Sequence, residues 1–425
     1  MTRFPLSCSP LRSATPLAAL VLGLTVTLLL ALATPPPASA ATAAGACSGP
    51  SGDAFYDPPS PLPAGQHGGI IWCRAVTSPT AGASAWQILY LSTTVSGAAT
   101  AVSGTLLVPA NATGRLVAYA AGTQGWGDQC APSREMAAGD FDEQFAVNNL
   151  LAKGWAVVVT DYPGLGTPGD EAYNVGIPEG YAVLDALRAA TLVPGAGLSQ
   201  GAPMGIEGYS QGGAAADWAA QLQPRYAPGL DLAGVAAGGT PANLQAVAQN
   251  INGTIWFAFL AGTANGFNAA YPSLDLSAEL TPQGRAALAA LDQMCQAQGL
   301  LTYAGHHIQD YTVGGVNPVS QPQWQAVLDA NDLGTMAPRV PLLQYHGLVD
   351  EVIPWSVEVV LHRQYCALGV TTQLTGFPGD HVLTQVEAQG DVTGWLAGRF
   401  AGQPAPSNCY SAVPVAGASS PRPSV

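Results

Sequence analysis

The chain has 425 residues, of which 48% are hydrophobic and only 9% are charged, and its formal net charge at pH 7 is −14. So acidic a chain repels phosphate backbones, which argues against a nucleic-acid-binding protein. Its length suffices for one large domain with an insertion, or for two domains.

Residues 1–40 have the pattern of a secretory signal peptide. Arg3 and Arg12 give a basic start, residues 18–33 form an apolar run, and Ala38–Ala40 matches an A-x-A cleavage site. The apolar run is shorter than the roughly 20 residues that a membrane span needs. We therefore expect cleavage after residue 40 and secretion. No later stretch is long and apolar enough for a permanent membrane anchor.

Six cysteines remain in the mature chain: Cys47, Cys73, Cys130, Cys295, Cys366 and Cys409. An even number in an exported chain indicates three disulfides, although these spacings leave the pairing open. Zinc binding is the alternative. It is disfavoured because the sequence has no C-x-x-C or H-x-x-x-H spacing.

After the predicted signal peptide, the sequence predicts an irregular arm followed by three strands. Residues 41–85 are rich in Pro, Gly and Ser, which predicts an irregular N-terminal arm. Residues 86–95 and 99–108 flank a short Ser-Gly-Ala turn and predict a hairpin. Residues 116–120 predict a third strand, which leads into the glycine-rich turn at 122–125.

Helices and buried strands alternate after this turn. Residues 133–153 predict a helix with Ser133 as N-cap and Gly154 as C-cap. The almost continuous apolar run at 155–160 predicts a strand buried on both faces. Residues 179–193 predict an amphipathic helix with Tyr, Leu and Leu on one face.

Residues 204–216, MGIEGYSQGGAAA, predict a strand, a tight turn and the start of a helix, and 232–237 predict another buried strand. The alternation of strands and helices implies right-handed crossovers and a mostly parallel sheet. The predicted fold class is therefore α/β.

This alternation stops at residues 243–336. The segment has helical patterns, including Thr281 as N-cap and Pro282 in the first turn of a helix that continues over 286–297. It also has the aromatic-rich stretch 255–260, which is either ordinary core or a substrate contact. We interpret the segment as a helical cap inserted over the carboxyl edge of the sheet.

Strands return at 341–345 and 372–375, and 382–400 predicts a closing helix. A Pro/Ser-rich tail follows, with a composition typical of unstructured chain beyond its cysteine. The predicted parts are the signal peptide 1–40, the arm 41–85, the α/β core 86–242 and 337–400, the helical insertion 243–336 and the tail 401–425.

Ser210 is the candidate nucleophile. Gly208 and Gly212 surround it in a G-x-S-x-G turn, where a Cβ atom would collide as the chain reverses. The pentapeptide alone is weak evidence, because a second copy surrounds Ser199. That copy lies among loop residues, and Pro203 prevents a helix interior after it. Only Ser210 has a strand before it and a helix after it.

A serine hydroxyl needs a neighbouring base, and in sheet hydrolases the order along the chain is Ser, Asp or Glu, then His. His381 follows the last predicted strand and precedes the closing helix, which suits the general base. Asp350 follows the strand at 341–345 and suits the acid that orients this histidine. Glu351 is the fallback acid. Asp380 adjoins the histidine, so its side chain is poorly placed to reach the same ring.

The oxyanion of an acyl-transfer reaction needs backbone N–H donors from the residue after the nucleophile and from the loop after the third strand. These are Gln211 and the turn 122–125, in which Gln124 is the best single candidate. The alternative is that this stretch is only a tight turn.

Five motifs, taken together, resemble the secretory lipase family, α/β-hydrolases of fungi and actinomycetes of the yeast lipase A type. The resemblance covers roughly residues 50 to 400, and the motifs occur in the family's order. They are GTQGWGDQCAPS (122–133), DYPGLG (161–166), EGYSQGG (207–213), GGTP (238–241) and HGLVDEVIP (346–354).

The resemblance implies an α/β-hydrolase with a helical lid inserted after GGTP. It places the triad on Ser210, Asp350 and His381 and the oxyanion donors on Gln124 and Gln211. Many relatives of this fold have His-Gly before the oxyanion loop, where this chain has Ala-Gly, so a possible orienting side chain is missing. The backbone donors are unaffected.

The similarity at CAPS implies that Cys130 pairs with Cys295. The pairs Cys366–Cys409 and Cys47–Cys73 then follow by proximity. The family's usual activity is hydrolysis of triacylglycerols and other carboxylic esters, with no metal or cofactor.

We therefore expect a secreted ester hydrolase whose partner is a lipid or ester substrate, with at most transient contact with a lipid interface. Two alternatives remain. A serine peptidase on the same fold would cleave peptidyl-anilides but not esters. A catalytically silent binder of lipid or cell-wall material would not be labelled by a fluorophosphonate at the elbow serine.

Overall fold

The computed structural model describes residues 47–411, 413–414 and 416. The predicted signal peptide lies outside this part of the chain. No helix in the described part is both long and apolar enough to cross a membrane.

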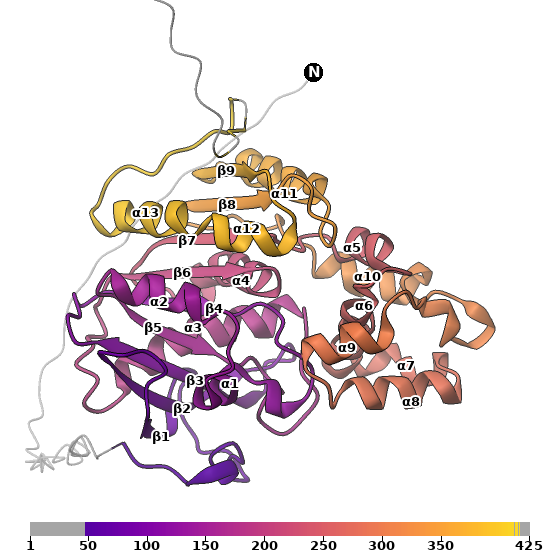
Figure 1. Cartoon of the computed structure of the whole chain (residues 1–425), viewed down its shortest axis with the longest axis horizontal. Coiled ribbons are helices and arrows are strands. Elements are labelled where there is room, and N and C mark those ends of the chain that lie inside the picture. Colours follow the sequence, from indigo (N-terminus) through magenta and orange to yellow (C-terminus); the bar gives the residue numbers. More distant parts are fainter. Residues whose placement is uncertain (1–46, 412, 415, 417–425) are drawn as a thin grey trace, which may run out of the picture. The chain divides into compact units, whose positions relative to one another are not determined.

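The described residues form one nine-stranded sheet with the strand order β1-β2-β3-β5-β4-β6-β7-β8-β9 (Figure 1). Strands β1, β2, β3 and β5 pair antiparallel in turn, and β5, β4 and β6 to β9 pair parallel. The predicted α/β class with a mostly parallel sheet is confirmed. The strands are β1 Ile70–Val76, β2 Ala83–Thr93, β3 Ala99–Pro109, β4 Leu116–Ala120, β5 Ala156–Thr160, β6 Met204–Tyr209, β7 Leu232–Gly238, β8 Leu342–Gly347 and β9 Thr372–Phe377.

Helices cover both faces of this sheet, which is why its central strands β4, β5, β6 and β8 are buried along their whole length. In β4, Leu116, Ala118 and Ala120 belong to one hydrophobic core. Val117 and Tyr119 belong to the core on the other face. All five side chains are buried, as the strand's two-residue period requires when both sides are packed.

Helices α3, α4 and α11 pack in the first core, and α2 and α13 pack in the second. The helices α5 to α10 lie between β7 and β8 in the sequence and are grouped at one end of the sheet in Figure 1. The helices are α1 Pro132–Ala138, α2 Gln144–Ala152, α3 Gly176–Leu192, α4 Gln211–Tyr226, α5 Leu244–Ile251, α6 Phe257–Ala270, α7 Leu276–Glu279, α8 Pro282–Leu291, α9 Gln296–Tyr303, α10 Pro322–Ala330, α11 Trp355–Ala367, α12 His381–Glu387 and α13 Gln389–Phe400.

The prediction of an irregular arm over 41–85 is wrong at Ile70–Val76, which forms β1 and pairs antiparallel with β2. This strand lies at the edge of the sheet and is mostly half-buried. It therefore has no clean alternation of apolar and polar residues. The Pro and Gly residues around it favoured the prediction of an irregular segment.

Three predicted helices are shorter than expected. The helix over 133–153 is divided into α1 and α2 at Gly139, whose φ of 85° gives the left-handed conformation typical of a glycine C-cap. The closing helix is divided into α12 and α13 at Ala388. In the insertion, the helix predicted to continue to residue 297 is α8, which ends at Leu291. Its predicted N-cap is confirmed, because Thr281 accepts a hydrogen bond from the backbone of Gly284.

Ser133 is not an N-cap but lies inside α1. Its backbone N–H and its hydroxyl both donate to the buried carboxylate of Asp161, at 2.7 and 2.5 Å. These bonds join the segment after β4 to the end of β5. The polar residue that suggested a helix start therefore makes a tertiary contact.

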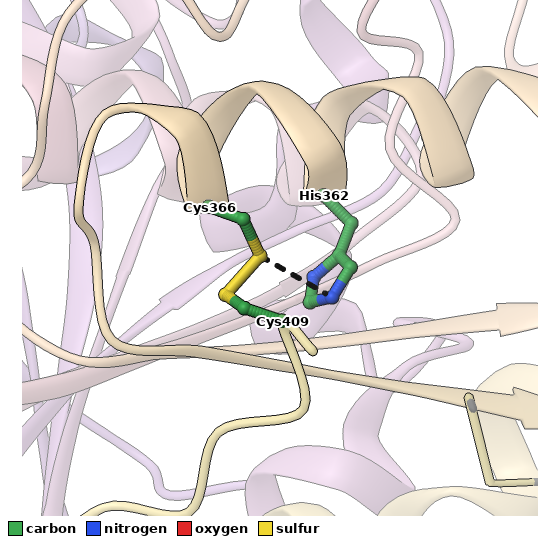
Figure 2. Close-up of side chains that lie close together, drawn as sticks. All are labelled: His362, Cys366 and Cys409. Carbon is green, nitrogen blue, oxygen red and sulfur yellow. Dashed lines mark hydrogen bonds between the residues drawn. A yellow bond between two sulfur atoms is a disulfide. The ribbon is translucent and has the colours of Figure 1, made fainter. Parts of the chain in front are cut away.

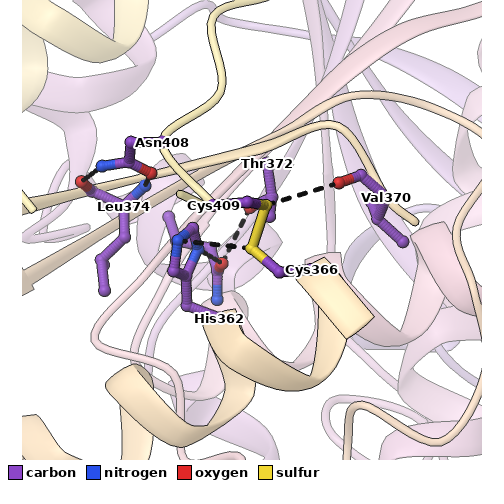
Figure 3. The surroundings of a disulfide bond; sticks show 8 residues. His362, Cys366, Val370, Thr372, Leu374, Asn408 and Cys409 are labelled. Carbon is purple, nitrogen blue, oxygen red and sulfur yellow. Dashed lines mark hydrogen bonds between the residues drawn. A yellow bond between two sulfur atoms is a disulfide. The ribbon is translucent and has the colours of Figure 1, made fainter. Parts of the chain in front are cut away.

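The six cysteines form three disulfides, Cys47–Cys73, Cys130–Cys295 and Cys366–Cys409. The family resemblance implied Cys130–Cys295, and the other two pairs agree with the pairing inferred from proximity. The bond between Cys366 on α11 and Cys409 attaches the C-terminal segment to this helix (Figure 2). Beside it, the side chain of Asn408 exchanges two hydrogen bonds with the backbone of Leu374 in β9 (Figure 3). The tail thus covers backbone groups at the edge of the sheet.

Candidate active site

Ser210 lies in a sharp turn between β6 and α4. Its φ of 58° and ψ of −122° are strained for a residue with a side chain. The turn is possible only with glycines beside it. A Cβ at Gly208 would lie 2.1 Å from the carbonyl oxygen of Gly212, and a Cβ at Gly212 would lie 1.9 Å from that of Ala120. The sequence therefore holds the hydroxyl at the carboxyl end of a central strand.

Ser199 has no such setting. It lies in the exposed connection between α3 and β6, and its hydroxyl accepts a hydrogen bond from the backbone of Gly201. The second G-x-S-x-G copy is therefore a surface turn, as its sequence context predicted.

Three of the predicted site residues come together at the carboxyl ends of β6, β8 and β9. The Oγ atom of Ser210 lies 2.9 Å from Nε2 of His381. The Nδ1 atom of the same histidine lies 2.6 Å from Oδ2 of Asp350. Parallel strands bring their carboxyl ends to one edge, which is how residues separated by up to 171 positions can meet. The order and geometry are those of a nucleophile, a base and an orienting acid.

Backbone groups fix the acid and the base. Oδ1 of Asp350 accepts from the backbone N–H groups of Val352 and Ile353, at 2.9 and 2.7 Å. Burial alone would raise the pKa of this carboxyl. The hydrogen bond and charge of His381, with other donors nearby, outweigh burial and lower the pKa below its usual value. The hydroxyl of Tyr209 donates to the carbonyl oxygen of His381 at 2.7 Å.

The two rival acids have other contacts. Glu351 accepts a hydrogen bond from the backbone N–H of His381 through Oε2, at 3.2 Å. Asp380 caps α12 by accepting from the backbone of Leu383. Only Asp350 contacts the imidazole ring among these three carboxylates of the described chain.

Gln211 is the first residue of α4, so its backbone N–H has no acceptor within the helix. Its side-chain amide donates to two buried carboxylates, Glu171 at 3.1 Å and Glu179 at 2.8 Å. Burial raises the pKa of Glu179 to about 8 and that of Glu171 well above its usual value. The two buried acids therefore hold the side chain of Gln211 in place beside the nucleophile.

Gln124 lies in the buried turn after β4. Its side chain donates to the carbonyl of Gly122 at 3.3 Å, and its own carbonyl accepts from the backbone of Gln296 at the start of α9 at 2.7 Å. Within the described residues, the hydrogen-bond network contains no acceptor for its backbone N–H. The turn and the helical insertion are thus joined at this position.

A narrow cavity of about 30 Å³ opens beside Ser210. Helices α5 and α6 of the insertion supply most of its apolar wall, including Leu244, Ile251 and Leu260. Val352 and Ile353, which hold Asp350, complete that wall. The insertion therefore covers the hydroxyl with aliphatic side chains, and this volume holds at most a few water molecules.

Sequence reasoning missed a second histidine at this site. His346, at the end of β8, is completely buried, and its Nε2 lies 3.3 Å from Oδ2 of Asp350. The only sequence signal is its position in the same short motif, four residues before the acid. The other histidines are elsewhere: for example, His67 contacts Asp185 on α3, and His306 contacts Tyr311 in the insertion.

One cluster in the described chain brings three potential metal-ligand side chains close together: His362, Cys366 and Cys409 (Figure 2). The two sulfur atoms form a disulfide, so neither is a thiolate. Nε2 of His362 lies 3.6 Å from the Cys366 sulfur, and burial lowers the pKa of this imidazole. We interpret the cluster as packing around a disulfide.

A family model described as secretory lipase matches residues 139–408. The chain belongs to this family. It is 30% identical over 405 residues to Lipase 10 of Candida albicans, covering 86% of this chain and 84% of the relative. It is also 30% identical over 375 residues to secreted triacylglycerol lipase LIP7 of Malassezia globosa, covering 83% and 79%.

The fold is similar to that of Candida antarctica lipase A in its closed state. The TM-score is 0.75 at 24% identity, over 84% of this chain and 87% of that structure. The predicted α/β-hydrolase fold is thereby confirmed. As a secretory lipase family member, the chain is a serine ester hydrolase.

Proposed function

We propose that this protein is a secreted lipase that hydrolyses acylglycerols and related carboxylic esters through Ser210, His381 and Asp350. The observation that carries the proposal is the unbroken series of contacts from the Ser210 hydroxyl through the imidazole to a buried carboxylate. The series lies under an apolar cavity wall, which suits an acyl chain.

In this mechanism His381 accepts the proton of the Ser210 hydroxyl while the oxygen attacks the ester carbonyl. The backbone N–H groups of Gln211 and Gln124 stabilise the oxyanion that forms. The tetrahedral intermediate collapses, the histidine donates its proton to the leaving alcohol, and an acyl-enzyme remains. Water, deprotonated by the same histidine, then releases the fatty acid. Asp350 holds the imidazole tautomer and stabilises the imidazolium.

The substrate class follows from the wall of the cavity. Leu244, Val247, Ile251, Phe259 and Leu260 face the space beside the nucleophile and favour an aliphatic chain over a polar peptide. Because the cavity has a volume of about 30 Å³, a long-chain ester requires displacement of α5 and α6. We propose that residues 243–336 act as the lid whose movement admits substrate.

The N-terminal pattern supports secretion. A basic start, an apolar run and an A-x-A site precede the first cysteine of three disulfides, and disulfides persist in oxidising compartments. The related Malassezia globosa protein is described as a secreted triacylglycerol lipase. N-terminal sequencing of protein recovered from culture medium tests this, with Ala41 expected as the first residue.

The decisive experiment compares Ser210→Ala with Ser199→Ala in hydrolysis of a p-nitrophenyl ester. Loss of one triad member costs about 10⁴-fold or more in kcat, so the first variant should be inactive. The second should retain most activity. Equal loss in both would contradict the assignment.

Two further measurements separate the alternatives. A fluorophosphonate should label wild-type protein and not Ser210→Ala, and absence of labelling would favour a silent binder. Hydrolysis of esters with acyl chains from short to long, with and without emulsified triacylglycerol, tests the lipase assignment. Cleavage of peptidyl-anilides but not esters would replace it with a peptidase.

A further inference from the structure

A second imidazole contacts the carboxylate of the candidate triad. Nε2 of His346 lies 3.3 Å from Oδ2 of Asp350, the oxygen that also bonds His381. The same nitrogen lies 2.8 Å from the carbonyl oxygen of Ile353. On the other side of the ring, Nδ1 lies 3.1 Å from Oε2 of Glu358 on α11. The acid of the site is therefore held between two histidines.

These contacts favour one protonation state of His346. A carbonyl oxygen and a carboxylate face Nε2, and a carboxylate faces Nδ1, so both ring nitrogens face hydrogen-bond acceptors. A neutral imidazole would direct one lone pair at an oxygen atom, whereas an imidazolium donates from both nitrogens. The geometry therefore favours the charged ring.

The surroundings make a buried charge tolerable. Both His346 and Glu358 have 0% exposure, and a buried charge is stable only when it is paired and hydrogen-bonded. Glu358 also accepts from the side-chain amide of Gln344 at 2.7 Å and from the backbone of Thr240 at 3.2 Å. Three donors therefore face this carboxylate, and the imidazolium is its counterion.

The two carboxylates near this ring also favour the imidazolium of His346. Burial lowers the pKa of His346, but the hydrogen bond and charge of Glu358 and the charge of Asp350 outweigh burial and raise it. His381 faces the same carboxylate from α12. Tyr209 on β6 lies near that carboxylate, and its pKa is raised by burial and by the charge of Asp350. The ring of Trp355 packs beside His346, with centroids 5.7 Å apart.

We propose that His346 is a positioning residue for catalysis, an imidazolium held by Glu358 that orients Asp350 and keeps it ionised while His381 transfers the proton of the nucleophile. The inference rests on the proposed function, because it needs the Ser210–His381–Asp350 series to be catalytic. His346 is not among the residues that line the cavity beside Ser210.

The proposal has a direct consequence for the pH dependence of the reaction. Without His346, Asp350 loses a donor and a neighbouring positive charge, so the carboxylate attracts a proton on the catalytic base more strongly. The acid limb of kcat/KM, which reports protonation of that base, should then move to higher pH. A purely structural role would lower stability without moving the limb.

The test is His346→Gln in the mature protein, with His362→Gln as matched control. His362 is also buried and joins the same network through Gln344, at 2.9 Å, but does not contact Asp350. Hydrolysis of p-nitrophenyl butyrate is measured from about pH 5 to about pH 9, with active sites counted by fluorophosphonate labelling.

We expect His346→Gln to lower kcat per labelled site about 10- to 100-fold, with KM within about twofold. Its acid limb should move up by about 0.5 to 1 pH unit. His362→Gln should change the melting temperature only. A His346→Gln profile equal to that of wild type, or equal changes in both variants, would overturn the proposal.

A second measurement does not depend on the folding of that variant. In ¹⁵N-histidine-labelled wild-type protein at neutral pH, both ring nitrogens of His346 should be protonated, and Glu358→Gln should remove one of the two protons. A neutral ring in wild type would overturn the proposal. Retention of activity in Ser210→Ala would instead refute the proposed function, so the two failures are distinguishable.

Discussion

Trp126 packs so closely against Gly262 that a Cβ atom on residue 262 would lie 1.8 Å from the indole Nε1. Gly262 is in α6 of the helical insertion, and Trp126 is in the loop after β4, two residues beyond Gln124. The ring also packs edge-on against Tyr173. A side chain as small as a methyl group would therefore separate the insertion from the loop that supplies the proposed oxyanion donor.

We expect Gly262→Ala to lower the free energy of unfolding by about 1–3 kcal/mol, because overpacking a filled interface forces neighbouring groups to move. Displacement of Trp126 should also misplace the N–H of Gln124 and lower kcat about tenfold. Chemical denaturation and ester hydrolysis per labelled site would measure the two effects.

Gly394→Ala is the control for this substitution. Gly394 is an exposed residue inside α13, and a Cβ there meets no atom within 4 Å. Alanine should stabilise that helix by about 0.5–1 kcal/mol and leave kcat unchanged. Stabilisation by both substitutions would show that the contact between Trp126 and α6 is looser than the structure indicates.

The disulfide Cys130–Cys295 joins the same loop to the insertion, across 165 residues of sequence. Gly125 and Cys295 form an isolated antiparallel bridge beside it. We expect replacement of both cysteines by serine to cost about 2–5 kcal/mol, since the cross-link restricts a long loop in the unfolded chain. The loop around Gln124 should also lose order, which would lower kcat.

Replacement of Cys366 and Cys409 by serine is the comparison for this variant. This pair spans 43 residues and holds the tail against β9, away from the oxyanion loop. It should lower the melting temperature but leave kcat per labelled site near that of wild type. Similar kcat losses in both double variants would mean that Cys130–Cys295 has no specific effect on the site.

The parts of the site predictable from sequence are those that depend on position along strands. Ser210, Asp350 and His381 each follow a strand, and parallel strands end at the same edge, so their meeting follows from the order of elements. The choice between Ser210 and Ser199 depends on the same local context. The glycines beside Ser210 and the proline after Ser199 can be read directly from the sequence.

The contacts that sequence could not predict depend on packing between distant elements. His346 contacts Glu358 across β8 and α11, and its spacing alone does not distinguish it from an ordinary buried histidine. The amide of Gln211 is held by Glu171 and Glu179, which lie 40 and 32 residues earlier. The division of the helix at Gly139 did have a local signal, but the apolar residues on both sides outweighed it.

Several buried acids should make this protein more stable in mildly acidic than in alkaline solution. Glu207 in β6 is the clearest case. Burial, with the charge of Glu143 nearby, raises its pKa to about 8, from an ordinary value of 4.5. Between these values the unfolded state has lost the proton while the folded state retains it. The free energy of unfolding therefore falls as pH rises, by up to about 1.4 kcal/mol per pH unit for one group.

Asp350 affects the pH dependence of stability in the opposite direction, because its pKa is lowered in the folded protein. Its contribution is lost only as pH falls through that lowered value, so it does not cancel the effect of Glu207 above about pH 5. Burial raises the pKa of Glu143 to about 7 and that of Glu179 to about 8, in the same direction as Glu207. The melting temperature should accordingly fall between about pH 5 and about pH 8.

Glu207→Gln tests this explanation, because glutamine resembles the neutral acid and can still accept the hydrogen bond from Gln389, which is 2.9 Å long. Its melting temperature should depend less steeply on pH than that of wild type and should exceed it near pH 8. Glu387→Gln, at an exposed position, should leave the slope unchanged. If Glu207→Gln lowered the melting temperature equally at every pH, Glu207 would be ionised in the folded protein, and the raised pKa would be wrong.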